Sequence, residues 1–198
     1  MKKIALSEHQ ARRAKLLSLM ATNSICVIGA ASAQTRSNDT EYNFRQDSYF
    51  WYLTGFNEPD ATLILIKDSA GQTHVGISVQ PKDEQAEIWH GRRLGADAAI
   101  NSLAVDSAFD NTQLTAQLID MFSGKTTVYS LFIQSHVKRA VDKTILALKQ
   151  IPKKGVLAPS SHIDVQSWLD EARLIKSPAE IALMQSVADI SAQAHCQA

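Results

Sequence analysis

Residues 87–95 hold the side chains in this sequence that are best suited to bind another molecule. Trp89 is followed by two glycines and by the pair Arg92 and Arg93. Tryptophan and arginine are among the residue types most enriched at binding hot spots. An indole ring also commonly anchors its own loop on the protein core. The sequence therefore leaves two interpretations of Trp89 open: a contact with a substrate or partner, and an anchor for its own loop.

Asp39 is a second candidate, in the polar loop at residues 35–39. Its carboxylate is able to hold a cationic group or to make an Asx-turn before Tyr42. We favour the local turn, because aspartate routinely bonds its own backbone in such loops.

The sequence lacks the motifs of metal sites, serine hydrolases and phosphate loops. The six histidines are too widely spaced for a short-range metal site, and the sequence has neither H-E-x-x-H nor C-x-x-C. The strained G-x-S-x-G elbow of serine hydrolases is absent. Gly124-Lys125-Thr126 lacks the earlier glycine and the strand-to-helix order of a phosphate loop. We therefore expect this chain to bind no metal and no nucleotide, and no acid–base pair stands out.

The composition excludes several classes of partner. The chain of 198 residues carries 20 basic and 20 acidic residues, so no global field attracts nucleic acid or a membrane surface. No segment approaches transmembrane length. Polar residues at 22–24 interrupt the apolar stretch near the N-terminus, unlike a secretory signal. With Cys26 and Cys196 expected to be unpaired, we expect a cytoplasmic protein.

The elements that position these residues follow from periodicity and turn chemistry. Ser7 with Gln10 predicts the capping-box start of an amphipathic helix. Residues 61–66 and 74–79 read as strands of a hairpin, and residues 81–95 as a loop-rich stretch. We further expect strands at 25–28, 50–53 and 126–131, and helices at 111–122 and 137–148. Alternating strands and helices predict an α/β fold, a mixed β-sheet flanked by helices.

The last residues predict one more helix. Ser177 is a candidate N-cap, Pro178 occupies the first helical position and Glu180 the third. Apolar residues then recur at helical spacing to Ala194, with no stop signal. We expect a chain cut inside the first helix of a further domain, with residues 1–173 forming the first domain and 174–198 the linker and that helix.

Three motifs resemble one enzyme family. Residues 39–59 match D-x-x-Y-x-F-R-Q-x-S-x-F-x-Y-L-T-G-F-x-E-P, and residues 87–95 match E-I-W-x-G-R-R-x-G. Residues 157–159 and 171–181 match the linker that follows. Together they resemble the N-terminal domain of bacterial Xaa-Pro aminopeptidase (aminopeptidase P), a creatinase-like domain, over essentially the whole chain.

The resemblance implies a function that this chain supports without performing it. Full-length members join this domain to a C-terminal pita-bread domain. Two Asp, one His and two Glu there bind two metal ions, usually manganese, and a metal-bridging hydroxide attacks the bond before a penultimate proline. All five ligands lie beyond residue 198, so we expect this chain alone to be an inactive piece that serves oligomerisation, as a homotetramer or homodimer, and substrate access.

The resemblance also assigns site residues. Trp89 matches a family tryptophan whose loop reaches a neighbouring subunit's active site, and Asp39 matches an acid near the mouth of that site. Lys153 falls near a family arginine, keeping its charge but not its planar fork. Substrate-binding residues are thus Trp89, Asp39 and Lys153, the partners being the catalytic domain, neighbouring subunits and peptides with proline second. Alternatives are the same domain of a prolidase- or creatinase-type hydrolase, or a non-catalytic peptide-binding module.

Overall fold

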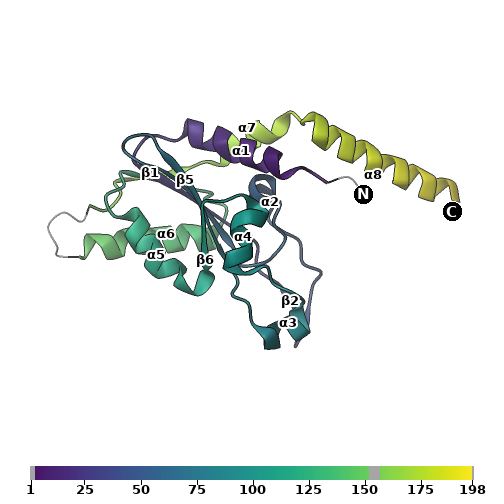
Figure 1. Cartoon of the computed structure of the whole chain (residues 1–198), viewed down its shortest axis with the longest axis horizontal. Coiled ribbons are helices and arrows are strands. Elements are labelled where there is room, and N and C mark those ends of the chain that lie inside the picture. The colour runs from purple at the N-terminus through teal and green to yellow at the C-terminus, as the bar shows by residue number, and fades with distance from the viewer. Residues whose placement is uncertain (1–2, 152–156, 198) are drawn as a thin grey trace.

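The computed structural model describes residues 3–151 and 157–197 and confirms the mixed sheet flanked by helices. Six strands lie in the order β6-β5-β4-β1-β7-β8 (Figure 1). The central pairs β1–β4 and β4–β5 are antiparallel, so the predicted hairpin is confirmed. The pairs β5–β6, β1–β7 and β7–β8 are parallel. The strands are β1 Ser24–Gly29, β4 Thr62–Lys67, β5 Thr73–Val79, β6 Ser107–Asp110, β7 Thr127–Ser130 and β8 Ser161–Asp164.

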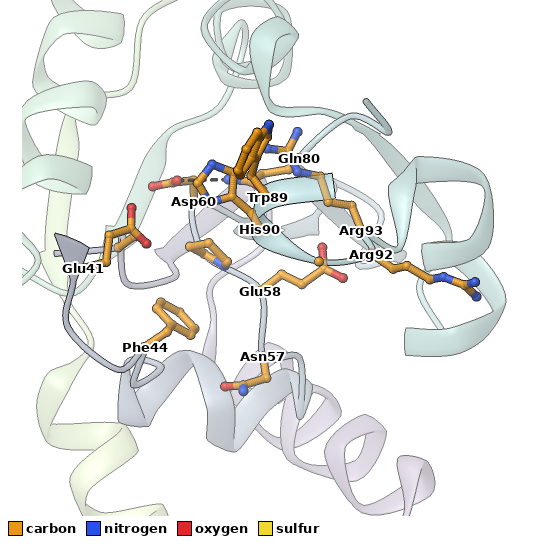
Figure 2. A pocket seen from close by; sticks show the side chains of 13 residues that line it. Glu41, Phe44, Asn57, Glu58, Asp60, Gln80, Trp89, His90, Arg92 and Arg93 are labelled. Atoms are coloured by element: carbon orange, nitrogen blue, oxygen red, sulfur yellow. Dashed lines mark hydrogen bonds between the residues drawn. The ribbon is translucent and has the colours of Figure 1, made fainter. Parts of the chain in front are cut away.

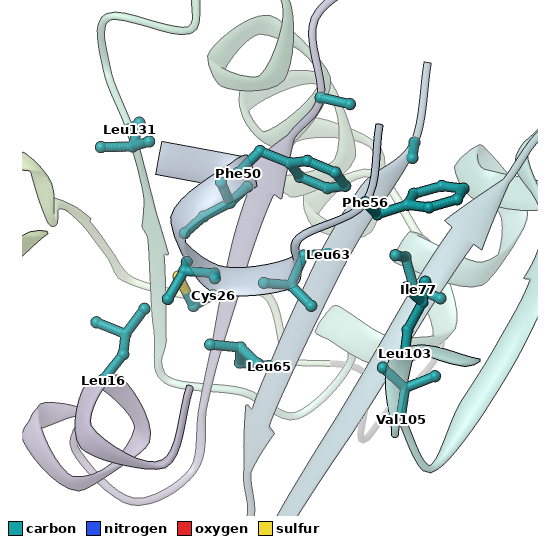
Figure 3. Packing of buried hydrophobic residues seen from close by; sticks show 14 of the residues in the cluster. Leu16, Cys26, Phe50, Phe56, Leu63, Leu65, Ile77, Leu103, Val105 and Leu131 are labelled. Carbon is teal, nitrogen blue, oxygen red and sulfur yellow. The ribbon is translucent and has the colours of Figure 1, made fainter. Parts of the chain in front are cut away.

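Helices cover both faces of this sheet. The alternation of strand side chains divides β1, so that Cys26 and Ile28 join one apolar cluster while Ile25 and Val27 join the other. The larger cluster includes residues from α1, α2, α4 and α7 (Figure 3), and the smaller one residues from α5 and α6. The helices are α1 Leu6–Leu19, α2 Ser48–Thr54, α3 Glu84–His90, α4 Gly95–Leu103, η1 Asn111–Gln113, α5 Leu114–Phe122, α6 Ser135–Lys149, α7 Gln166–Leu174 and α8 Pro178–Gln197.

The strand predicted at residues 50–53 is wrong, because these residues form helix α2. The Asp47 carboxylate caps that helix by accepting hydrogen bonds from the backbone N–H groups of Tyr49 and Phe50, both at 2.9 Å. Phe50 and Leu53, one helical turn apart, are both fully buried. In a strand they would point to opposite faces of the sheet, so packing overrides the β-propensity of the aromatic run.

Two local predictions near helix ends also differ from the structure. The first helix begins at Leu6, with Ala5 at its N-cap and no side-chain cap, so the capping box at Ser7 is wrong. The stretch 81–95 contains helix α3, whose N-terminus is capped by Asp83 accepting from the Ala86 N–H at 3.0 Å. The capping box at Ser177 is confirmed by reciprocal hydrogen bonds with Glu180.

Arg13 is a buried arginine of α1 that connects the C-terminal ends of α2 and α4. Arg13 is 2% exposed, and its guanidinium donates to the carbonyl of Leu53 at 2.9 Å and to those of Leu103 and Ala104 at 3.0 and 2.8 Å. These carbonyls end helices α2 and α4, where the helix dipole favours a positive charge. Burial lowers the pKa of the guanidinium, but arginine stays charged because its ordinary pKa is so high.

Helix α8 projects from the body as a separate rod (Figure 1). None of its residues is buried. Four large apolar side chains along it, Ile181, Met184, Val187 and Ile190, are about half exposed.

Candidate functional site

A pocket of about 650 Å³ lies at the end of the molecule that carries α3. Its lining comes from residues that flank or belong to the short hairpin of β2 Thr35–Ser37 and β3 Thr40–Glu41, from the turn that precedes β4, from Gln80 after β5, and from the end of α3 with the arginines that follow (Figure 2). Its polar and aromatic lining includes Glu41, Phe44, Glu58, Trp89, His90 and Arg93. The pocket therefore joins two of the three sequence motifs, although the 27 residues 60–86 separate them in the chain.

Trp89 stands out from this pocket into solvent. Its exposed fraction is 83%, and that of the adjacent Ile88 is 76%. No residue of α3 is buried. An indole that anchored its own loop would be largely covered, so the geometry removes that interpretation. The indole therefore presents a large amphipathic surface to solvent, and its contact with a substrate or partner stays a prediction.

Glu58 holds the segment that follows Trp89. Its Oε1 accepts the backbone N–H of Leu94 at 2.9 Å, while Arg93 donates through Nη1 to the carbonyl of Pro81 at 3.1 Å. Burial raises the pKa of the Glu58 carboxyl, and the Leu94 hydrogen bond and the charge of Arg93 oppose that rise. Glu58 Oε2 and Arg93 Nε are buried without a protein partner among the described residues.

Glycines let the chain turn at both ends of this segment. Gly91 ends α3 with φ 86°, and Gly95 begins α4 with φ 72°. A Cβ at Gly95 would lie 2.9 Å from the exposed, flexible side chain of Lys82, so it is the positive φ that favours glycine here. Trp89 is thus carried by a helix capped at Asp83 and clamped after its last turn.

The other two site residues from the sequence are placed differently. Asp39 lies in the exposed turn between β2 and β3, two residues before Glu41, which lines the pocket. The hairpin brings Asp39 to the same end of the molecule as α3 (Figure 1). Whether its carboxylate makes an Asx-turn or binds a cation stays a prediction. Lys153 lies outside the described residues.

One arrangement of reactive residue types was not predicted from the sequence. His162 Nε2 lies 2.7 Å from Ser130 Oγ, and His162 Nδ1 lies 3.2 Å from Asp142 Oδ1. This is the order of contacts in a serine-hydrolase triad. Ser130, however, is completely buried on β7, between β1 and β8, where no substrate carbonyl reaches it. The three side chains therefore tie β7 and β8 to α6, and they carry no hydrolytic function.

The described residues contain no group of three or more His, Cys, Asp or Glu side chains that could hold a metal ion. The pair of metal ions implied by the sequence resemblance thus finds no fitting ligand set in this part of the chain. Cys26 is buried and Cys196 exposed, and both are free. Over the same residues, no helix is both long and apolar enough to span a bilayer.

Comparisons with a protein family, with individual proteins and with solved structures all identify the same relatives of this chain. Residues 9–129 match the family described as Aminopeptidase P, N-terminal domain. Xaa-Pro aminopeptidase of Escherichia coli K12 is 39% identical over the full chain, and human Xaa-Pro aminopeptidase 3 is 32% identical over 94% of it. The chain spans 45% and 38% of the length of these two relatives.

Solved structures agree. The chain superimposes on the zinc-substituted E. coli aminopeptidase P in complex with product with a TM-score of 0.93 at 39% identity. Proline aminopeptidase P II from Yersinia pestis gives 0.93 at 40% identity. In both cases 98% of this chain is covered, against 44% and 45% of the other. The chain therefore belongs to the aminopeptidase P N-terminal domain family and is homologous to the N-terminal region of E. coli Xaa-Pro aminopeptidase.

Proposed function

We propose that this chain is the non-catalytic N-terminal domain of a metal-dependent Xaa-Pro aminopeptidase, which removes the residue before a penultimate proline. The observation that supports the proposal most is the exposed Trp89, held in place at the edge of a pocket by segments of two family motifs. The relatives compared above are Xaa-Pro aminopeptidases by name, which favours this function over prolidase or creatinase chemistry.

In this proposal the end of the molecule with Trp89 faces the active site of a neighbouring subunit. Trp89 and Asp39 restrict access to extended peptides and help to orient them, which contributes to catalysis through positioning and water exclusion rather than through bond-making. The same surface joins subunits of a homotetramer or homodimer. Lys153 joins this set by the family pattern alone.

In this proposal the catalytic chemistry belongs to a second domain that follows the N-terminal domain. Residues 1–173 form the N-terminal domain, and residues 174–198 form the linker and the first helix of the catalytic domain. Two manganese ions belong to the catalytic domain, whose ligands follow residue 198. The free thiols of Cys26 and Cys196 suit the cytoplasm, where we place the protein.

A domain exchange tests the proposal. This chain replaces the matching N-terminal region of E. coli Xaa-Pro aminopeptidase, and hydrolysis of a proline-containing tripeptide is measured with manganese. We expect turnover from the chimera and none from the chain alone. Trp89→Ala in the chimera lowers kcat/KM by about tenfold, the loss of a hot-spot contact of about 1.4 kcal/mol.

Leu146→Ala is the matched control, because Leu146 is 57% exposed on α6, away from α3 (Figure 1). It leaves kcat/KM unchanged. Metal-dependent turnover by the 198-residue chain alone would contradict the non-catalytic assignment. Equal kinetics for the Trp89 and Leu146 variants would contradict the role of Trp89.

A further inference from the structure

The start of α8 is bound to the body through polar side chains that the proposed function does not use. Among the described residues, the hydrogen bonds and ion pairs that join α8 and its N-cap to other elements involve Ser177 and Glu180. Beyond this first turn the helix has no buried residue. Leu183 and Met184, one turn further on, line a pocket together with Trp51 and Tyr52 of α2. The direction in which α8 leaves the body therefore depends on contacts made by its first two turns.

Arg12 on α1 lies at the centre of these contacts. Its guanidinium pairs with Glu8 at 2.7 Å and with Glu180 at 3.2 Å, and it also donates to the backbone carbonyl of Tyr52 at 3.0 Å. Its central carbon lies 4.2 Å from the centre of the Tyr52 ring, within cation–π range. Only 9% of the Arg12 side chain is exposed, so water screens these charges weakly.

Glu8 connects the same cluster to the N-cap of α8. Its Oε1 accepts hydrogen bonds from both Arg12 and the Ser177 hydroxyl. The Ser177 hydroxyl in turn accepts the backbone N–H of Glu180 at 3.2 Å, as an N-cap should. The residues that start the helix are thus the residues that bind it to α1.

Two tyrosines of α2 bind α7, the helix that precedes the linker. The Tyr52 hydroxyl donates to the carbonyl of Ala172 at 3.0 Å, and the Tyr49 hydroxyl donates to Asp170 at 2.7 Å. The Arg173 guanidinium lies 4.7 Å from the centre of the Tyr49 ring. Both tyrosines therefore fix α7 up to its last turn, a few residues before α8 begins.

We propose that Glu8, Arg12, Ser177 and Glu180 form a latch, the α8 latch, that fixes the direction of α8 relative to the six-stranded sheet. Arg12 is the positioning residue of this latch, because its planar fork satisfies two carboxylates and a carbonyl at once, which a lysine ammonium cannot reproduce in the same geometry. The relatives are more than twice as long as this chain, so in a full-length protein the latch would aim the segment that follows α8.

A distance measurement between two spin labels tests the latch directly in this chain. Cys196, exposed near the end of α8, takes one label, and a Lys15→Cys substitution on the solvent side of α1 takes the other. Cys26 stays unlabelled because it is buried. We expect one narrow distance distribution, and in Arg12→Met a distribution about twofold wider as α8 samples several directions.

Matched variants separate the latch from general destabilisation. Lys138→Met breaks an exposed ion pair with Asp142 on α6 and leaves the distribution narrow. Glu180→Ala breaks the latch from α8 without touching the core, so it broadens the distribution even if Arg12→Met fails to fold. Arg12→Lys gives an intermediate width. Unchanged narrow distributions in a folded Arg12→Met or in Glu180→Ala would overturn the proposal.

Discussion

Replacing Trp89 with alanine will cost little stability, and this sets Trp89 apart from the buried aromatic residues. Since the residue is 83% exposed, about one sixth of its surface is covered. For a side chain of about 250 Å² this is about 40 Å², worth at most about 1 kcal/mol at about 25 cal/mol per Å². The better helix propensity of alanine offsets part of that loss.

Phe50→Ala is the comparison for this measurement. Phe50 is completely buried in the larger cluster, so its truncation costs about 3–5 kcal/mol. For a chain of this length each kcal/mol moves Tm by about 2–4 °C. Thermal or urea unfolding of the purified chain therefore gives a shift of at most about 4 °C for Trp89→Ala and on the order of 10 °C for Phe50→Ala. Similar shifts for the two variants would show that the indole stabilises its own domain, and would refute the contact role.

Three further outcomes follow from single side chains. Arg13→Met leaves two buried carbonyls and one partly buried carbonyl without their donor and lowers stability by about 3 kcal/mol. The exposed Arg36→Met gives no measurable change, and equal unfolding curves for the two variants would disprove the role of Arg13. Burial lowers the pKa of His9, so the unfolded state takes up a proton before the folded state as pH falls below about 6.5, and stability decreases with pH from there. In urea unfolding measured over this pH range, His9→Asn makes the dependence of stability on pH less steep. An unchanged pH dependence would show that His9 does not cause it. Glu58→Leu removes the acceptor for the Leu94 N–H and speeds tryptic cleavage after Arg92. Glu58→Gln keeps an acceptor, so cleavage stays slow. Equal cleavage rates for the two variants would mean that Glu58 does not hold the segment around Leu94.

The fold class and most strands could be predicted from the sequence because their signals are local. Short apolar runs gave β1 and β4, and the turn residues between β4 and β5 gave the hairpin. Helix α2 could not be predicted in the same way. Its aromatic residues favour a strand locally, and only the fit of Phe50 and Leu53 to the core, together with the Asp47 cap, decides for a helix.

The candidate site was predicted in part. Trp89 was found from residue type, but its exposure, which separates the two interpretations, depends on how α3 sits on the body. The Glu58–Leu94 hydrogen bond spans 36 residues and the Glu8–Ser177 bond spans 169, and no local pattern announces contacts of that range. A signal for Glu58 did exist, since it lies in the first family motif. Its partner is a backbone amide, however, and no pattern of side chains identifies such a partner.

We propose that Trp89 contacts another molecule in an aminopeptidase whose chemistry lies outside this chain. The most direct measurement is kcat/KM of the chimera with E. coli Xaa-Pro aminopeptidase for a proline-containing tripeptide, with and without Trp89→Ala. We expect a loss of about tenfold, with a shift in Tm of at most about 4 °C and unchanged metal content. An unchanged kcat/KM in the folded, metal-loaded variant would contradict it.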